Sequence, residues 1–193
     1  MRLLFTVLLL LASAAAHAAD APPLPPCDQP IRFTAEWFAD PPQEFDKSPD
    51  FLASQGAPAS EGATALGLVT VQNAISVTPG KSCRGLTVSL QFVHPVLRVI
   101  RELPPGTCAH AHVLRHEYTH VHIYREMARQ FRQLVYPFPD SATPDAVLHY
   151  AKQQLAKLQE AQRLFDSPEE YAGNLTACNG EIARLLAAAK KSG

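Results

Sequence analysis

The residues best suited to chemistry are His116, Glu117 and His120, which form a His-Glu-x-x-His motif. Two histidines four residues apart on a helix lie on one face, about 6 Å apart along the axis, so both rings can reach one metal ion. Zinc binds histidine nitrogen at about 2.0–2.1 Å, and a glutamate directly after the first ligand can act as a general base on metal-bound water. The pattern therefore predicts zinc bound by His116 and His120, with Glu117 as the base.

The segment around the motif is expected to form one long helix. Residues 107–134 contain no Gly or Pro, and Thr107 is a suitable N-cap. Apolar residues and the two histidines recur every three or four positions, which places the motif on or beside the buried stripe. The alternative is an amphipathic helix whose histidines only pack or face solvent. The residues of the stripe are Val113, His116, His120, Ile123, Met127, Phe131 and Leu134.

The first 18 residues have the pattern of a cleaved secretory signal peptide. Arg2 precedes a short apolar run that ends in Ala16-His17-Ala18, with small residues where a signal peptidase cleaves. The run is shorter than the roughly 20 residues that span a bilayer, so we expect no stable membrane insertion after cleavage. The sequence thus predicts export to the periplasm or the medium, with residues 19–193 forming a single domain.

Net charge and cysteine content further limit which partners and which cellular compartment are expected for this protein. The formal net charge is −1, with no basic field for nucleic acid or for a membrane surface. The four cysteines are an even number in a chain expected to be exported, which favours disulfides, although spacing does not choose among three connectivities. We predict, as a hypothesis, that Cys27 pairs with Cys83 and Cys108 with Cys178. Oligomeric state has no signal in the sequence.

The remaining pattern predicts an α+β fold, with an N-terminal antiparallel sheet followed by about three C-terminal helices. Residues 39–65 have no sustained hydrophobic period, which predicts a long loop, with a short helix within it left open. Helices are expected from Pro144 to about Phe165 and from Pro168 to about Lys190. Alternating apolar residues indicate strands at 31–38, 69–77 and 86–92, and a short one at 96–100.

A catalytic zinc needs a third protein ligand and one open position. His112 lies eight residues before His120, about 12 Å along the axis, which is too far to share the ion. If a Cys108–Cys178 disulfide joins antiparallel helices, residues 166–170 face residues 116–120. This alignment places the carboxylates of Glu169 and Glu170 opposite the histidines. Three further residues stay open as the third ligand: His94, His149 and Cys178.

The segment Glu170-Tyr-Ala-Gly-Asn174-Leu-Thr-Ala177 resembles the Glu-x-x-Ala-Asn-x-Phe-Ala segment of minimal gluzincin metallopeptidases. The resemblance covers this segment and the 116–120 motif, and Gly173 and Thr176 depart from it. It implies a zincin-like fold in which Glu170 binds zinc and Asn174 orients His116. As an alternative, Glu170 only completes a capping box with Ser167.

These features together lead us to expect an exported zinc peptidase acting on a peptide or protein substrate. The strand at 86–92 is expected to offer an edge to an extended peptide, as the edge strand of that clan does. Tyr124, His149 and Tyr150 are all open as the group that stabilises the transition state. Two alternatives remain: a zinc hydrolase of a non-peptide or cell-wall amide, and a non-catalytic, zinc-stabilised binding domain.

Overall fold

The computed structural model describes residues 23–56 and 64–192, so the predicted signal segment 1–18 lies outside the described residues. A four-stranded sheet precedes most of the helical structure, which confirms the predicted α+β class. Within the described part of the chain, no helix is apolar over a length that could span a bilayer.

The sheet is built around one long strand, β4 (Arg84–Val99). The strands β1 (Pro26–Glu36) and β2 (Gln43–Glu44) lie parallel to β4 along one of its edges, whereas β3 (Gly67–Pro79) lies antiparallel along the other. The sheet is therefore mixed, and the expected antiparallel arrangement holds only for β3 and β4. The reason is that the chain continues in one direction from β1 to β2 before it returns as β3. The predicted loop 39–65 contains β2 and the short helix α1 (Pro49–Ser54).

The two strands expected at 86–92 and 96–100 form one continuous strand interrupted by a β-bulge. Between the pairs Thr70–Val96 and Gln72–Val93, two residues of β4 face only one residue of β3. The two residues of β4 in the bulge are His94, which has a φ of 52°, and Pro95. Proline has no N–H to donate to a ladder, and bulges are where central strands tolerate it.

The bulged strand β4 cannot act as the substrate edge that we expected of residues 86–92, because β1 and β3 pair with it on both sides. Among the described residues, β3 pairs only with β4. Within the described part of the chain, the outer edge of β3 is therefore unpaired, and β3 also contacts α2 and α3.

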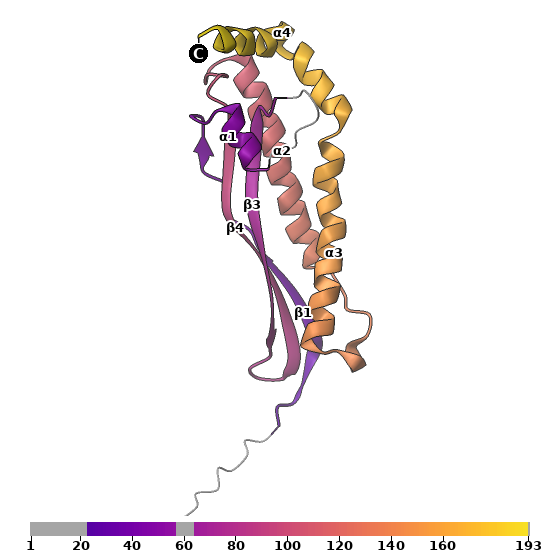
Figure 1. Ribbon diagram of the computed structural model, residues 1–193. Coiled ribbons are helices and arrows are strands. Elements are labelled where there is room, and N and C mark those ends of the chain that lie inside the picture. Colours follow the sequence, from indigo (N-terminus) through magenta and orange to yellow (C-terminus); the bar gives the residue numbers. More distant parts are fainter. Residues whose placement is uncertain (1–22, 57–63, 193) are drawn as a thin grey trace, which may run out of the picture.

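The two central helices closely match the predicted segments. The helix α2 (Cys108–Phe131) begins after Thr107, whose hydroxyl accepts a hydrogen bond from the His110 N–H. The helix α3 (Pro144–Phe165) begins in the same way after Thr143. Figure 1 shows α2 and α3 running side by side along the sheet.

Two apolar clusters hold the sheet and helices together. One packs β1 and β4 against the second half of α2 and the first half of α3. The other packs the end of β4 against the first half of α2 and Ile182 of the last helix. The His-Glu-x-x-His motif lies on α2 between Val113 and Val121 of the second cluster, and Met127 of the first cluster follows it on the same helix.

The last helix, α4 (Pro168–Ser192), is bent rather than continuous as predicted (Figure 1). Its backbone leaves the helical region at Ala177, and Cys178, Asn179 and Gly180 all have positive φ. Asn and Gly adopt this left-handed conformation more readily than other residues, which makes the Asn179-Gly180 pair a natural place for the break. The second half of α4 consequently crosses the end of the sheet (Figure 1).

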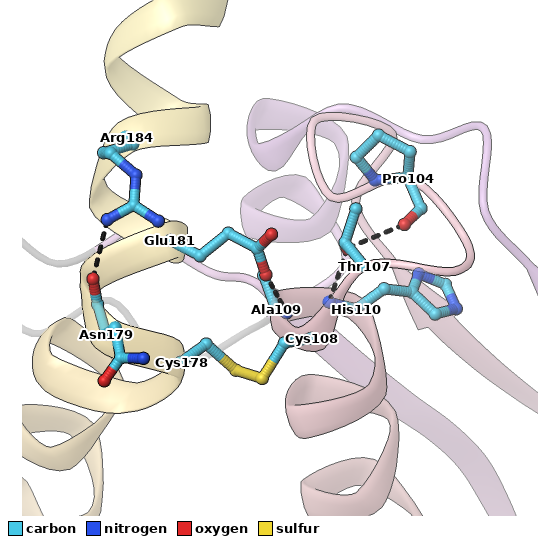
Figure 2. The surroundings of a disulfide bond; sticks show 9 residues. All are labelled: Pro104, Thr107, Cys108, Ala109, His110, Cys178, Asn179, Glu181 and Arg184. Carbon is cyan, nitrogen blue, oxygen red and sulfur yellow. Dashed lines mark hydrogen bonds between the residues drawn. A yellow bond between two sulfur atoms is a disulfide. The ribbon is translucent and has the colours of Figure 1, made fainter.

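Two disulfides have the pairing that we hypothesised from the sequence. One joins Cys27 to Cys83, and the other joins Cys108 to Cys178 with a Cα–Cα distance of 5.7 Å. Figure 2 shows the second bond linking the first turn of α2 to the bend of α4. Beside it, the Glu181 carboxylate accepts a 2.7 Å hydrogen bond from the Ala109 N–H. Disulfides of this kind are typical of proteins that fold in an oxidising compartment.

Candidate metal and catalytic site

Three potential metal ligands converge where the end of α3 meets α2: His116, His120 and Asp166. Asp166 Oδ1 lies 3.2 Å from His116 Nε2 and 3.0 Å from His120 Nε2, and the two nitrogens are 3.2 Å apart. Around a tetrahedral zinc with bonds of about 2.0–2.1 Å, the ligand atoms lie about 3.4 Å from one another. The triangle formed by these three atoms therefore has nearly the size that one zinc ion requires.

Gln162 determines which nitrogen of His120 is free to bind a metal. Its side-chain N–H donates to the His120 carbonyl at 3.1 Å, which turns its Oε1 toward His120 Nδ1 at 2.6 Å. Nδ1 must carry a proton to make that contact, so in the neutral ring Nε2 carries a lone pair. This lone pair points at an oxygen of Asp166. Two such atoms repel unless a proton or a metal ion lies between them.

The charges around the ligands favour a cation. Burial raises the pKa of Asp166, but hydrogen bonds from His116 and His120 outweigh it and lower that pKa to about 2. Burial also lowers the pKa of His120, yet Asp166, Glu117 and Gln162 together raise it above its usual value. In the metal-free protein the site thus attracts a proton, and the same field would attract a divalent ion.

Phe165, the last residue of α3, holds the two imidazole rings in place. Its ring stacks on His116 with centroids 4.7 Å apart, and it meets His120 edge-on at 5.1 Å. The end of α3 therefore supplies a ligand, a hydrogen-bonding amide and an aromatic support within five residues, from Gln162 to Asp166.

Glu117 lies between the metal ligands and the edge strand β3, with only 4% of its surface exposed. A β-carbon added to Gly67 would lie 2.7 Å from Glu117 Cγ and closer still to its Oε1. The carboxylate also accepts a hydrogen bond from the Val69 backbone. Burial raises the pKa of Glu117 to about 7, although the nearby histidines act against this shift. The strand thus leaves a space, at Gly67, that only the glutamate fills.

Replacing Gly67 by Ala should displace Glu117 while leaving the metal ligands in place. The added methyl group overlaps the flexible end of the glutamate and not a ligand atom. If zinc-dependent hydrolysis takes place at this site, it should fall about 10–100-fold at unchanged zinc content, because misplacing a reacting group by about 1 Å can cost about 100-fold in rate. Peptide cleavage and metal analysis of the purified variant measure the two effects.

The matched control is Gly173→Ala, in which the added β-carbon meets nothing within 4 Å. Full activity of the Gly67→Ala variant would show that the edge strand does not position Glu117.

A cavity opens directly on these groups and connects them to the sheet edge. Its walls combine the three potential ligands and Glu117 with Val113, Tyr124 and residues 65–69, which include the start of β3. Polar reacting groups therefore face a space bordered by the backbone of β3. A site of this kind can hold an extended chain beside a metal ion.

The other residues considered as a third ligand do not join this group. His94 is exposed at the bulge of β4, and His149 is exposed on α3 beside Gln153. Cys178 is bonded to Cys108. The side chains of Glu169, Glu170 and Asn174 lie outside what the structure describes, so the roles given to them by the gluzincin resemblance remain predictions.

Asp166, Gln162 and Gly67 are the residues of the site that sequence reasoning missed. A signal for Asp166 was present, because the disulfide alignment set the whole interval 166–170 opposite the motif. We expected the carboxylate to come from the last helix, whereas Asp166 is the C-cap residue that directly follows α3. No sequence motif identifies Gln162 or Gly67. Each lies on a different element from the His-Glu-x-x-His motif and contacts it only in the folded protein.

Comparison with known proteins yields no family: no family model, curated protein or solved structure matches the chain.

Proposed function

We propose that this chain is an exported, zinc-dependent peptidase in which His116, His120 and Asp166 bind the metal and Glu117 is the general base. The observation that carries the proposal is the triangle of three ligand atoms, with sides of 3.0–3.2 Å, beside a buried glutamate. Two histidines and a carboxylate suit zinc among the common metal ions.

Zinc bound there would polarise a scissile carbonyl and lower the pKa of its water toward 7. The chain's own part is proton transfer: Glu117 takes the proton of the attacking water and passes it to the leaving amine. In the metal-free protein burial raises the pKa of Glu117 to about 7, and a bound zinc ion would lower that pKa and keep the carboxylate ionised, as a general base requires. Val69 and Gly67 hold this carboxylate between the metal ligands and the strand.

The free edge of β3 supports a peptide as the substrate. An extended chain added to this edge would lie along the cavity wall formed by residues 65–69. Main-chain hydrogen bonds to a strand edge recognise the backbone of a peptide regardless of its sequence. A cell-wall amide or another non-peptide amide would use the same metal and base, but it would gain little from a strand edge.

A non-catalytic zinc site is the remaining alternative. Structural zinc is enclosed by four protein ligands, whereas catalytic zinc keeps one position open. Among the described residues, the group at His116 contains three ligands, and a cavity adjoins it. This arrangement favours catalysis.

Metal content provides the first test. The mature chain should bind about one zinc, and His116→Ala, His120→Ala and their combination should each lose it, because two ligands do not retain a catalytic zinc. Elemental analysis measures the zinc, and mass spectrometry of casein and of a mixed peptide library measures cleavage.

Full zinc occupancy in the double mutant would refute the site. Zinc binding without cleavage of any peptide, together with a fourth protein ligand in a metal-loaded structure, would instead support the binding-domain alternative.

A further inference from the structure

We propose that the Tyr124 hydroxyl is a catalytic hydrogen-bond donor, which binds the oxygen that becomes negative when the scissile carbonyl is attacked. The inference rests on the proposed function and adds a residue to it. It follows from the place of Tyr124 in the cavity, from the packing of its ring and from the hydrogen bonding of its hydroxyl.

Tyr124 lies on α2 one turn after His120, on the same helix face. Helical side chains lean toward the N-terminus of their helix, so this ring extends back toward His120. Tyr124 lines the same cavity as the three metal ligands and Glu117. The phenol thus borders the space in which a carbonyl bound to the metal would sit.

The ring of Tyr124 is held rigidly by two aromatic neighbours. Trp37 stacks against it with centroids 5.9 Å apart at 17°, and Phe92 meets it edge-on at 5.5 Å. A hydrogen-bond donor that is already fixed in place stabilises the developing negative charge with no free-energy cost of reorientation during the reaction. The packing therefore supplies the preorganisation that an oxyanion donor needs.

The hydroxyl itself is free to donate. Among the described residues it has no hydrogen-bond partner, and burial raises the pKa of Tyr124, so the phenol keeps its proton. The other two residues considered for this role are engaged elsewhere. Tyr150 donates to the Val135 carbonyl at 2.8 Å, and His149 is exposed beside Gln153.

In the proposed step, Glu117 removes a proton from water while the water oxygen bonds to the carbonyl carbon. The electron pair of the C=O π bond moves onto the carbonyl oxygen, which becomes an oxyanion. Tyr124 donates a hydrogen bond to that oxygen and keeps its own proton. When the intermediate collapses, the C–N bond breaks and the amine leaves with the proton held by Glu117.

The test compares two inhibitors on the zinc-loaded protein, so that no natural substrate is needed. A phosphinic peptide carries a tetrahedral anionic oxygen where the oxyanion forms, whereas a mercaptoacyl peptide binds zinc through sulfur alone. Tyr124→Phe keeps the ring but removes the donor. It should weaken the phosphinic peptide about 10–100-fold, the value of one hydrogen bond to a charged group. Thiol affinity, zinc content and melting temperature should stay unchanged.

The matched control is Tyr150→Phe, which removes a hydroxyl that donates a hydrogen bond to the Val135 carbonyl. It should leave the ratio of the phosphinic-peptide and thiol affinities unchanged. Equal losses for both inhibitors, or no loss, in zinc-loaded Tyr124→Phe would overturn the inference and leave the proposed function standing. A wild-type protein that binds no zinc would overturn the proposed function and, with it, the role of Tyr124. Zinc-loaded wild type that binds the thiol but not the phosphinate would overturn the role of Tyr124 alone.

Discussion

Glu117→Gln is expected to retain zinc and the folded structure while hydrolysis falls about 10²–10⁴-fold, which is the usual contribution of general-base catalysis. Glutamine has nearly the shape of glutamate and can still occupy the space beside Gly67, but it cannot accept a proton. Single-turnover cleavage, zinc analysis and thermal unfolding separate the three quantities. The matched control on the same helix is Glu126→Gln, which alters a surface pair with Arg129.

The same variant has a readout that needs no substrate, namely the stability of the metal-free protein as a function of pH. Burial raises the pKa of Glu117 from 4.5 to about 7. Above pH 7 the folded wild type therefore holds a buried charge that water solvates in the unfolded chain, and this lowers its free energy of unfolding. Below pH 4.5 the residue is neutral in both states and has no such effect.

Glu117→Gln should accordingly be more stable than the wild type above pH 7 when zinc is removed. The advantage should shrink between pH 7 and 4.5 and vanish below that range. Chemical unfolding in the presence of a chelator, at about pH 4, 6 and 8, measures it. An equal stability difference at the two extremes would show that Glu117 does not titrate in the folded protein as its burial implies.

Asp166→Asn should have the second large effect, a loss of zinc affinity of more than about 100-fold. Even residues that only support a metal ligand change affinity by about 10–100-fold, and Asp166 supplies a ligand atom itself. A neutral amide oxygen is a weaker ligand than a carboxylate. Competition with a zinc indicator measures the affinity, and Asp140→Asn, an exposed acid before α3, controls for the change in net charge.

Glu170→Gln completes the comparison, because the gluzincin resemblance gives the ligand role to that residue. Loss of zinc in Asp166→Asn alone would assign the third ligand to Asp166. Loss in Glu170→Gln alone would contradict our assignment and favour the resemblance. Comparable losses in both variants would indicate a site closed by four protein ligands, and hence a structural zinc.

Much of the local structure followed from the sequence. Helix α2 was predictable because Thr107 can cap it, no Gly or Pro interrupts it, and apolar residues recur along one face. The same holds for α3, which starts at Pro144 as the Thr-Pro pair indicates. Spacing along α2 also placed His116 and His120 on one face, since a helix repeats every 3.6 residues. Each of these properties depends on neighbours within a few positions.

The pairing of the strands and the completion of the site were decided by tertiary structure. Alternation along residues 31–38 predicts a strand, but it does not show that β1 lies parallel to β4. Asp166 follows the last residue of α3, and Gly67 is the first residue of β3. No repeating pattern in the sequence around either residue indicates that it lies close to His116. Both reach the motif only because α3 and β3 pack against α2. Contacts between residues about 50 positions apart depend on how whole elements dock. Local spacing therefore determined two metal ligands and the base, whereas packing determined the third ligand and the groups that hold all of them in place.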